Sequence, residues 1–387
     1  MDLQARVTEA VAPYAARSEP PGLAWLVVRG DETAVGAHGS YGPDDPTPVR
    51  PDTPFRISSV TKPVVAAAAL SLLDDGTLTL DAPVERWLPE LADRRVLRDP
   101  AGPLDADPSK NTVPADRAIT VADVLELRLG LGLDFNGPFP GPVLSALAGL
   151  GLQAGPPAPQ TNPDPDTWMR AVGSVPLSYQ PGERWLYHTG CEVLGVLIAR
   201  AAGAPLPEVL AERVLDPLGM TSTGFGVRPE QAGRLGPHWL PPDGGALTAY
   251  DPVDGQWSRP PAFPNGGDGL VSTVADLAAF GRMLRSGGVA EDGARVLSEE
   301  VLADATRPRV GQIDEDGLSD WGLGFGVKTG DQPDGRGTGS YGWDGGMGST
   351  LWIDPAADVV AVLLTNQMWS SPQPTGVFEA FWRAAWA

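Results

Sequence analysis

Ser59-Val60-Thr61-Lys62 stands at the start of an apolar run that extends from Pro63 to Leu73. Residues i and i+3 lie on the same face of a helix, so this spacing lets the Lys62 amine reach the Ser59 hydroxyl. A serine becomes a nucleophile when a base removes its proton, and a lysine at a partly buried helix start can take that role. The chain has only three lysines. The same residues are also compatible with a serine that merely caps a solvated helix start.

Composition and charge narrow the classes of function. The 387 residues suffice for two structural domains, and a hydrophobic content of 42% is that of an ordinary globular protein. No apolar run approaches the roughly 18 residues of a membrane span, and a net charge of −21 repels nucleic acid and anionic lipid. We therefore expect no nucleic-acid partner and no membrane partner.

Cysteine and histidine are scarce. The single cysteine, Cys191, excludes an intrachain disulfide, and three histidines argue against a metal centre. We expect no metal and no cofactor. The first residues have the pattern of an amphipathic helix without a continuous apolar segment, so the expected compartment is the cytoplasm.

The two ends of the chain carry the clearest strand patterns. Gly22 to Arg29 and Val359 to Leu364 are apolar runs typical of buried strands, with hairpin partners at Thr33–Ser40 and Thr350–Ile353. Helices are expected at residues 1–16 and 375–386. An antiparallel sheet built from both chain termini and flanked by helices is the simplest assembly.

The middle of the chain is expected to be mainly helical. Apolar spacing predicts helices at residues 60–73, 121–127, 191–202 and 206–214. We therefore predict an α/β (α+β) fold with a sheet domain of residues 1–80 and 205–387, a helical domain of residues 81–204, and an active site in the cleft between them. The Pro/Gly-rich stretches 136–165 and 236–267 are expected to be lids or surface loops.

A serine and lysine pair still needs a group that carries a proton to the leaving group. Tyr187 is the candidate, since it directly precedes the helix that contains Cys191. A lysine ammonium favours a nearby phenolate, so Tyr187 and Lys62 could share one proton and act as a coupled base. Without Ser59, a tyrosine packed at a helix entry would be the more ordinary interpretation.

Four segments, taken in order, resemble the serine β-lactamase-like family, which contains class C β-lactamases, D-peptidases and family VIII carboxylesterases. They are F-R-I-S-S-V-T-K (55–62), P-G-E-R-W-L-Y-H-T-G (181–190), G-G-D-G-L-V-S-T-V-A-D-L (266–277) and G-W-D-G-G-M-G-S-T-L-W-I-D-P (342–355). The resemblance implies a β-lactamase/transpeptidase-like fold. It makes Ser59 the acylated nucleophile, Lys62 its proton acceptor or electrostatic partner, and Tyr187 the general base and acid. It also implies an oxyanion hole at the N–H groups of Ser59 and Gly346.

Two departures from the family pattern bear on the substrate. Thr189 stands where β-lactamases carry the asparagine of Tyr-x-Asn, and Trp343-Asp344-Gly345 stands where they carry Lys-Thr-Gly or His-Thr-Gly. The Trp-x-Gly version is similar to the family VIII esterases. The resemblance implies substrate-binding roles for Thr189, Trp343, Asp344 and Gly345. A literal Lys-Thr-Gly at residues 328–330 is the competing assignment, but the segment that follows it reads as a loop.

These features predict a serine hydrolase that acts through an acyl-enzyme, most simply a carboxylesterase on small esters. The same residues would serve a β-lactamase, a D-peptidase, or an acyltransferase to a small-molecule alcohol. The contrasting class is a catalytically dead binding protein of the same fold. The expected partner is a small-molecule ester or acyl substrate, and the sequence leaves the oligomeric state open.

Overall fold

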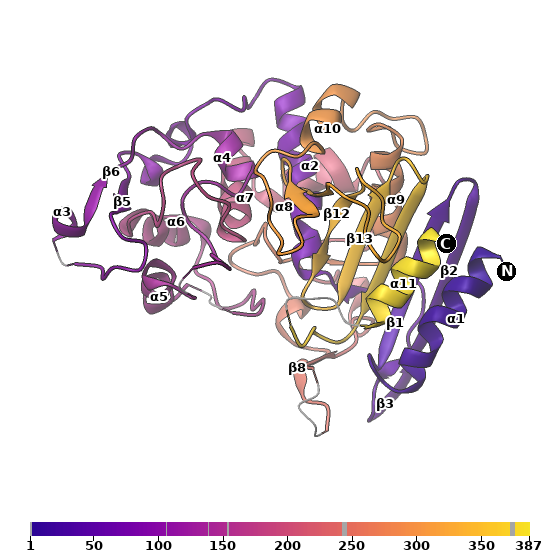
Figure 1. The fold of residues 1–387 in the computed structure, drawn as a ribbon. Coiled ribbons are helices and arrows are strands. Elements are labelled where there is room, and N and C mark those ends of the chain that lie inside the picture. The colour runs from indigo at the N-terminus through magenta and orange to yellow at the C-terminus, as the bar shows by residue number, and fades with distance from the viewer. Residues whose placement is uncertain (1, 106, 138, 153–154, 242–245, 372–375) are drawn as a thin grey trace.

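A computed structural model describes residues 2–105, 107–137, 139–152, 155–241, 246–371 and 376–387. Its centre is an eight-stranded antiparallel sheet with the strand order β10-β11-β12-β13-β14-β1-β2-β3 (Figure 1). The strands are β1 (Gly22–Arg29), β2 (Glu32–Gly42), β3 (Asp45–Pro48), β10 (Ser319–Trp321), β11 (Gly326–Lys328), β12 (Tyr341–Gly345), β13 (Ser349–Asp354) and β14 (Val359–Thr365).

The first and last strands of the chain are neighbours in the middle of this sheet. β1 pairs with β14 from Leu23 opposite Thr365 to Arg29 opposite Val359. Both strands are almost wholly buried because helices cover both faces, which explains their continuous apolar sequences. The predicted fold class, an antiparallel sheet from both chain termini flanked by helices, is confirmed.

Side chains of the central strands alternate between two cores. Leu23, Trp25 and Val27 point toward α1 (Leu3–Ala16) and α11 (Gly376–Trp386), whereas the residues between them join the main core. α1 and α11 lie side by side on the outer face (Figure 1). The expected helix starts at Met1 and Thr375 lie outside the described residues. On the inner face, α9 (Val274–Arg285) packs below β1, β13 and β14.

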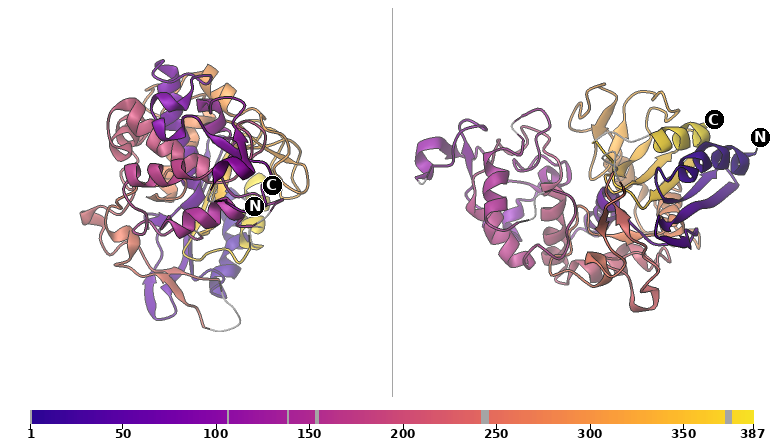
Figure 2. Two further views of the ribbon diagram at one scale, coloured as in Figure 1. Left: turned by 90° about the vertical axis from the view of Figure 1, so that its left-hand side faces the viewer. Right: turned by 90° about the horizontal axis from the view of Figure 1, so that it is seen from below.

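A mainly helical region extends beyond the sheet, with the long helix α2 (Thr61–Asp74) between the two (Figures 1 and 2). This region contains α3 (Pro108–Asn111), α4 (Val121–Leu125), α5 (Pro142–Gly149), α6 (Pro165–Ser174), α7 (Thr189–Ala202) and the strand pair β5 (Arg95–Leu97) and β6 (Thr112–Pro114). The domain boundaries at residues 80 and 204 remain predictions.

The remaining elements belong neither to the main sheet nor to the helical region of residues 81–204. They include α8 (Leu206–Leu210), α10 (Glu299–Ala305), the pair β4 (Phe55–Arg56) and β9 (Val271–Ser272), the pair β7 (His238–Trp239) and β8 (Ala249–Asp251), and short 3-10 turns such as η1 (Ser58–Val60). Within the described ranges, no single helix has the length and apolarity to cross a membrane; α7 and the segment Leu206–Leu215 would meet that test only as a pair bent by 83°.

Three expectations need correction. The stretch 236–267 is not only loop, since β7 and β8 pair within it. The stretch 136–165 is not only loop, since α5 forms within it, with Pro142 at a position near the start of the helix where its missing N–H costs nothing. The helix expected at 121–127 ends at Leu125, because Leu127 adopts a φ of 58° that no α-helix allows.

Candidate functional site

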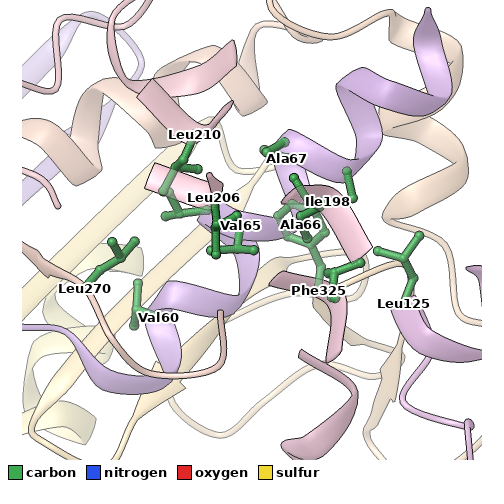
Figure 3. Packing of buried hydrophobic residues seen from close by; sticks show 14 of the residues in the cluster. Val60, Val65, Ala66, Ala67, Leu125, Ile198, Leu206, Leu210, Leu270 and Phe325 are labelled. Atoms are coloured by element: carbon green, nitrogen blue, oxygen red, sulfur yellow. The ribbon is translucent and has the colours of Figure 1, made fainter. Parts of the chain in front are cut away.

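Ser59 lies in η1, the 3-10 turn that leads into α2. Ser58 and Val60 on either side are buried, whereas Ser59 is partly exposed. Almost every residue of α2 up to Leu72 is buried. Figure 3 shows Val60, Val65 and Ala66 of this segment among side chains from other parts of the chain, including Leu270 and Phe325. The nucleophile candidate is therefore held by a helix that cannot shift without disturbing the core.

Lys62 is fully buried, one turn along from Ser59. Its Nζ lies 2.7 Å from Ser59 Oγ and donates a hydrogen bond of 2.8 Å to the carbonyl oxygen of Gly267. A third neighbour, His188 Nδ1, lies 3.3 Å from the same nitrogen. The spacing that the sequence contains thus produces the expected contact between amine and hydroxyl.

Tyr187 approaches this pair from the segment before α7, which forms an isolated bridge with Leu133. Lys62 Nζ lies 4.5 Å from the centroid of the Tyr187 ring, a cation–π contact. The phenol oxygen accepts a hydrogen bond of 2.8 Å from Trp343 Nε1. Lys62 Nζ therefore contacts the face of the Tyr187 ring, and the hydrogen bond to the Tyr187 oxygen comes from Trp343. The proton shared between Lys62 and Tyr187 stays a prediction.

Alternation along β12 separates the residues of the third motif. Trp343 faces Tyr187, whereas the carboxylate of Asp344 accepts hydrogen bonds from Thr350 Oγ1 and Trp352 Nε1. Trp352 belongs to the outer core beneath α1 and α11. The substrate contact expected of the Asp344 side chain has no support in this geometry, because its carboxylate is directed to the other face of the sheet.

Gly345 ends β12 against the nucleophile turn. A Cβ there would lie 2.6 Å from the carbonyl oxygen of Ile57, so no other residue allows the same approach of strand and turn. Gly346 follows in the exposed hairpin turn, and no atom of the described residues lies within 4 Å of where its Cβ would be. The Cα of Gly346 therefore faces open space, and Gly346 follows directly after the residue that contacts the nucleophile turn.

The N–H of Ser59 points at the Ser58 hydroxyl oxygen, 2.6 Å away, and the N–H of Met347 lies 3.4 Å from the same oxygen. Ser58 has a φ of 41°, a backbone conformation that is uncommon outside glycine. A substrate oxyanion at the predicted hole would have to replace the contact that Ser58 makes with Ser59. Sequence reasoning gave Ser58 no such role.

Thr189 and Lys328 were the remaining residues of interest in the second and third motifs. Thr189 is the buried first residue of α7. Lys328, in β11, donates to Ser319 Oγ and lies 4.8 Å from the Trp352 ring. Burial and the nearby Arg336 lower the pKa of Lys328 to about 8. The Lys-Thr-Gly at 328–330 thus begins on the outer face of the sheet, and Trp343 is the third-motif residue that contacts Tyr187.

Several residues near the site were missed from the sequence. Phe135 and Trp185 flank Tyr187, with ring centroids 5.7 Å and 5.5 Å from that of Tyr187. Phe135 is 53% exposed and directly precedes the stretch 136–165 that was expected to be a lid or surface loop. With Trp343 they form an aromatic wall around the Tyr187 ring. A Phe next to a Gly/Pro-rich stretch was the available signal in the sequence.

His188 and Asp268 were also missed. His188 Nε2 lies 3.7 Å from Glu192 Oε1 and 3.7 Å from Asp268 Oδ2. Burial raises the pKa of Asp268, and the positive charge that His188 and Lys62 can carry partly offsets that rise. An acidic residue next to Gly267 within a glycine-rich segment was the only hint in the sequence.

Comparisons with known proteins agree with this geometry. The Beta-lactamase family profile matches residues 7–377. Protein Rv1367c of Mycobacterium tuberculosis is 38% identical over 337 residues, which cover 83% of this chain and 79% of that protein. Esterase EstB of Burkholderia gladioli is 33% identical over 342 residues, with 82% and 79% covered.

Among solved structures, EstCE1, described as a hydrolase with promiscuous acyltransferase activity, superimposes with a TM-score of 0.81. It is 24% identical, with 100% of this chain and 98% of that one covered, and supports the fold alone. The resemblance inferred from the four sequence segments is confirmed. With a family match over nearly its whole length, the chain belongs to the Beta-lactamase family and is a serine hydrolase.

Proposed function

We propose that this protein is a carboxylesterase that cleaves small esters through an acyl group on Ser59. The observation that carries the proposal is the 2.7 Å contact between Ser59 Oγ and the fully buried Lys62 amine, with the Tyr187 ring 4.5 Å from that amine. The names of Esterase EstB and of the 30% identical Lovastatin esterase of Penicillium rubens support ester chemistry.

In the proposed reaction Ser59 Oγ attacks the ester carbonyl carbon while its proton passes to Tyr187, with Lys62 stabilising the charge that develops. The N–H groups of Ser59 and Gly346 are proposed to bind the oxyanion. The carbon–oxygen bond to the alcohol then breaks, and the alcohol leaves with the proton from Tyr187. Water attacks the acyl-Ser59 ester and gives a proton to Tyr187. The bond from the acyl carbon to Ser59 Oγ then breaks, Tyr187 returns that proton to Ser59, and the acid is released.

Two features favour an ester over a β-lactam or a D-peptide. Thr189 is buried at the place of the asparagine that would hold an amide side chain, and Trp343 stands where a cation would bind a carboxylate. An ester alkoxide also leaves with less help than an amide nitrogen. Acyl transfer to an alcohol is the second candidate, because the aromatic wall of Phe135, Trp185 and Trp343 could seat an apolar alcohol in place of water.

The test uses p-nitrophenyl butyrate, nitrocefin, and mass spectrometry after a fluorophosphonate. Ser59→Ala should abolish ester hydrolysis and labelling with the fold intact, since losing the nucleophile costs orders of magnitude in rate. Ser71→Ala is the matched control: Ser71 is a buried serine on α2, the helix that the Ser59 turn leads into, and its hydroxyl bonds only to Ala68 O among the described residues. It should keep full activity. A Ser59→Ala enzyme with substantial activity, or nitrocefin turnover equal to that of the ester, would overturn the proposal.

A further inference from the structure

The imidazole of His188 lies between the buried amine and two carboxylates. Its Nδ1 is 3.3 Å from Lys62 Nζ, and its Nε2 is 3.7 Å from Glu192 Oε1 and from Asp268 Oδ2. Lys62 is fully buried, while the side chains of Glu192 and Asp268 are 10% and 6% exposed. These groups, with the Tyr187 ring, are the charged or titratable groups that the structure places against His188.

The backbone at His188 is held in a tight turn that aims two side chains at one atom. Its φ of 81° and ψ of −64°, with a hydrogen bond of 3.2 Å from Thr189 N–H to Tyr187 O, are those of a γ-turn, a rare conformation for a residue other than glycine. This turn brings both the Tyr187 ring and His188 Nδ1 to Lys62 Nζ. Strained backbone of this kind persists only where surrounding contacts hold it.

The carboxylates select which ring nitrogen carries the proton. A neutral imidazole has one donor and one acceptor nitrogen, and a nitrogen that faces carboxylates is the one that keeps its hydrogen. Nε2 lies 3.7 Å from both carboxylates, and we assign the proton of the neutral ring to it, which leaves the lone pair of Nδ1 for Lys62. Asn265 fixes this side of the site further, because its Nδ2 donates to Glu192 and its Oδ1 accepts from the Gly267 N–H.

Gly267, two residues after Asn265, contacts both Lys62 and His188. Its carbonyl oxygen accepts from Lys62 Nζ at 2.8 Å, and a Cβ at this position would lie 3.0 Å from His188 Cε1. The loop and the imidazole therefore lie in contact on one side of the amine. Lys62 has two acceptors there, Gly267 O and His188 Nδ1, and Ser59 Oγ as its third neighbour.

We propose that His188 is a positioning residue that directs Lys62 at Ser59. The inference rests on the proposed function of Ser59 as the acylated nucleophile. With two N–H groups of Lys62 bound to Gly267 O and His188 Nδ1, the remaining tetrahedral position of the nitrogen points at Ser59 Oγ. That position is a lone pair that can accept the serine proton in the neutral amine, and an N–H that can stabilise the alkoxide in the ammonium. The direction is the same in both states.

A group that only aims Lys62 affects the acylation step and leaves substrate binding alone. The test compares His188→Leu, which removes the acceptor, with His188→Asn, whose amide oxygen can reach the place of Nδ1 and whose backbone tolerates positive φ. For each variant we would measure kcat and KM on p-nitrophenyl butyrate, the rate of fluorophosphonate labelling at Ser59, and the melting temperature.

His188→Leu should lower kcat and the labelling rate by roughly 10- to 100-fold, as misplacement of a reacting group does, while KM changes little. His188→Asn should recover most of this loss. Asp268→Asn, which removes one of the carboxylates at Nε2 and leaves the imidazole in place, should lower the labelling rate in the same direction by a smaller factor.

Three results would overturn the inference. They are a His188→Leu enzyme labelled as fast as the wild type, equal losses in His188→Leu and His188→Asn, and a loss confined to KM. If His188→Leu does not fold, an unchanged labelling rate in folded Asp268→Asn has the same force. Failure of the wild-type enzyme to be labelled at Ser59 would instead refute the proposed function.

Discussion

Replacing Trp343 with phenylalanine removes the indole N–H that donates to the Tyr187 oxygen at 2.8 Å. The ring position against Tyr187 and Trp321 stays occupied by an aromatic group. If Tyr187 carries the proton during acylation, its oxygen has phenolate character when it receives the serine proton. A donor fixed on that oxygen then stabilises the charged form and helps Tyr187 to act as the base.

The expected loss follows from the kind of hydrogen bond. A bond to a charged group contributes about 1.5–3 kcal/mol and a bond between neutral groups about 0.5–1.5 kcal/mol. Since each 1.36 kcal/mol is a factor of ten in rate, loss of a bond to a phenolate should lower kcat/KM by about 10- to 150-fold. Loss of a bond to a neutral phenol would lower it by only about 2- to 10-fold.

Trp185→Phe is the matched control. Trp185 also packs on Tyr187, with a centroid distance of 5.5 Å, but its buried Nε1 has no hydrogen-bond partner among the described residues. The same change there alters packing alone. The assay is kcat/KM for p-nitrophenyl butyrate on both variants, with melting temperatures to confirm folding. Equal, small losses in Trp343→Phe and Trp185→Phe would refute a charged Tyr187 oxygen held by Trp343.

Three further outcomes are expected. Lys328→Met should leave esterase activity unchanged and raise the free energy of unfolding at pH 7 by up to about 3 kcal/mol. Burial has lowered the pKa of Lys328 to about 8, so the charged Lys328 side chain destabilises the folded protein at this pH. The gain should shrink as pH rises from about 8 toward the ordinary lysine value near 10.5, and a gain that persists at pH 10.5 in thermal unfolding would contradict it. Arg56→Met should cost about 3–5 kcal/mol in urea unfolding, since it leaves the carboxylate of Asp251 unpaired in a site where both side chains are 2% exposed. The double variant with Asp251→Asn should recover part of that loss, and equal destabilisation of the single and double variants would argue against it. Burial raises the pKa of the Cys191 thiol to about 12, so iodoacetamide at pH 8 should leave the native protein unmodified and label it after denaturation; rapid labelling of the native protein would show that the thiol is accessible.

The sequence predicted elements best where one pattern ran long enough. Gly22–Arg29 is the strand β1, and the strand expected at residues 359–364 is β14, which is one residue longer. Both faces of these strands are buried, and a continuous apolar run of this length is typical of such a strand. β10 and β11 have three residues each and were missed, since three residues carry no readable period. The helix α5 was missed because proline and glycine dominate its surroundings.

Parts of the candidate site could likewise be predicted from the sequence and parts could not. The contact between Ser59 and Lys62 follows from spacing on one helix and could be anticipated. The placement of His188 could not, because it depends on a positive φ and on Asp268, which joins it only when distant segments fold together. The predicted roles of Ser59, Lys62 and Tyr187, like the cytoplasmic location, await direct measurement.

The pairing of β1 with β14 also sets the order in which this protein can be completed during synthesis. Leu23 leaves the ribosome long before its partner Thr365. Contacts between residues so far apart in sequence form late, because the loop between them must first be closed. The hairpin of β12 and β13, which abuts the nucleophile turn through Gly345, belongs to the same late segment. A nascent chain therefore lacks the strand edge against the nucleophile turn until the residues of β12 and β13 have been made.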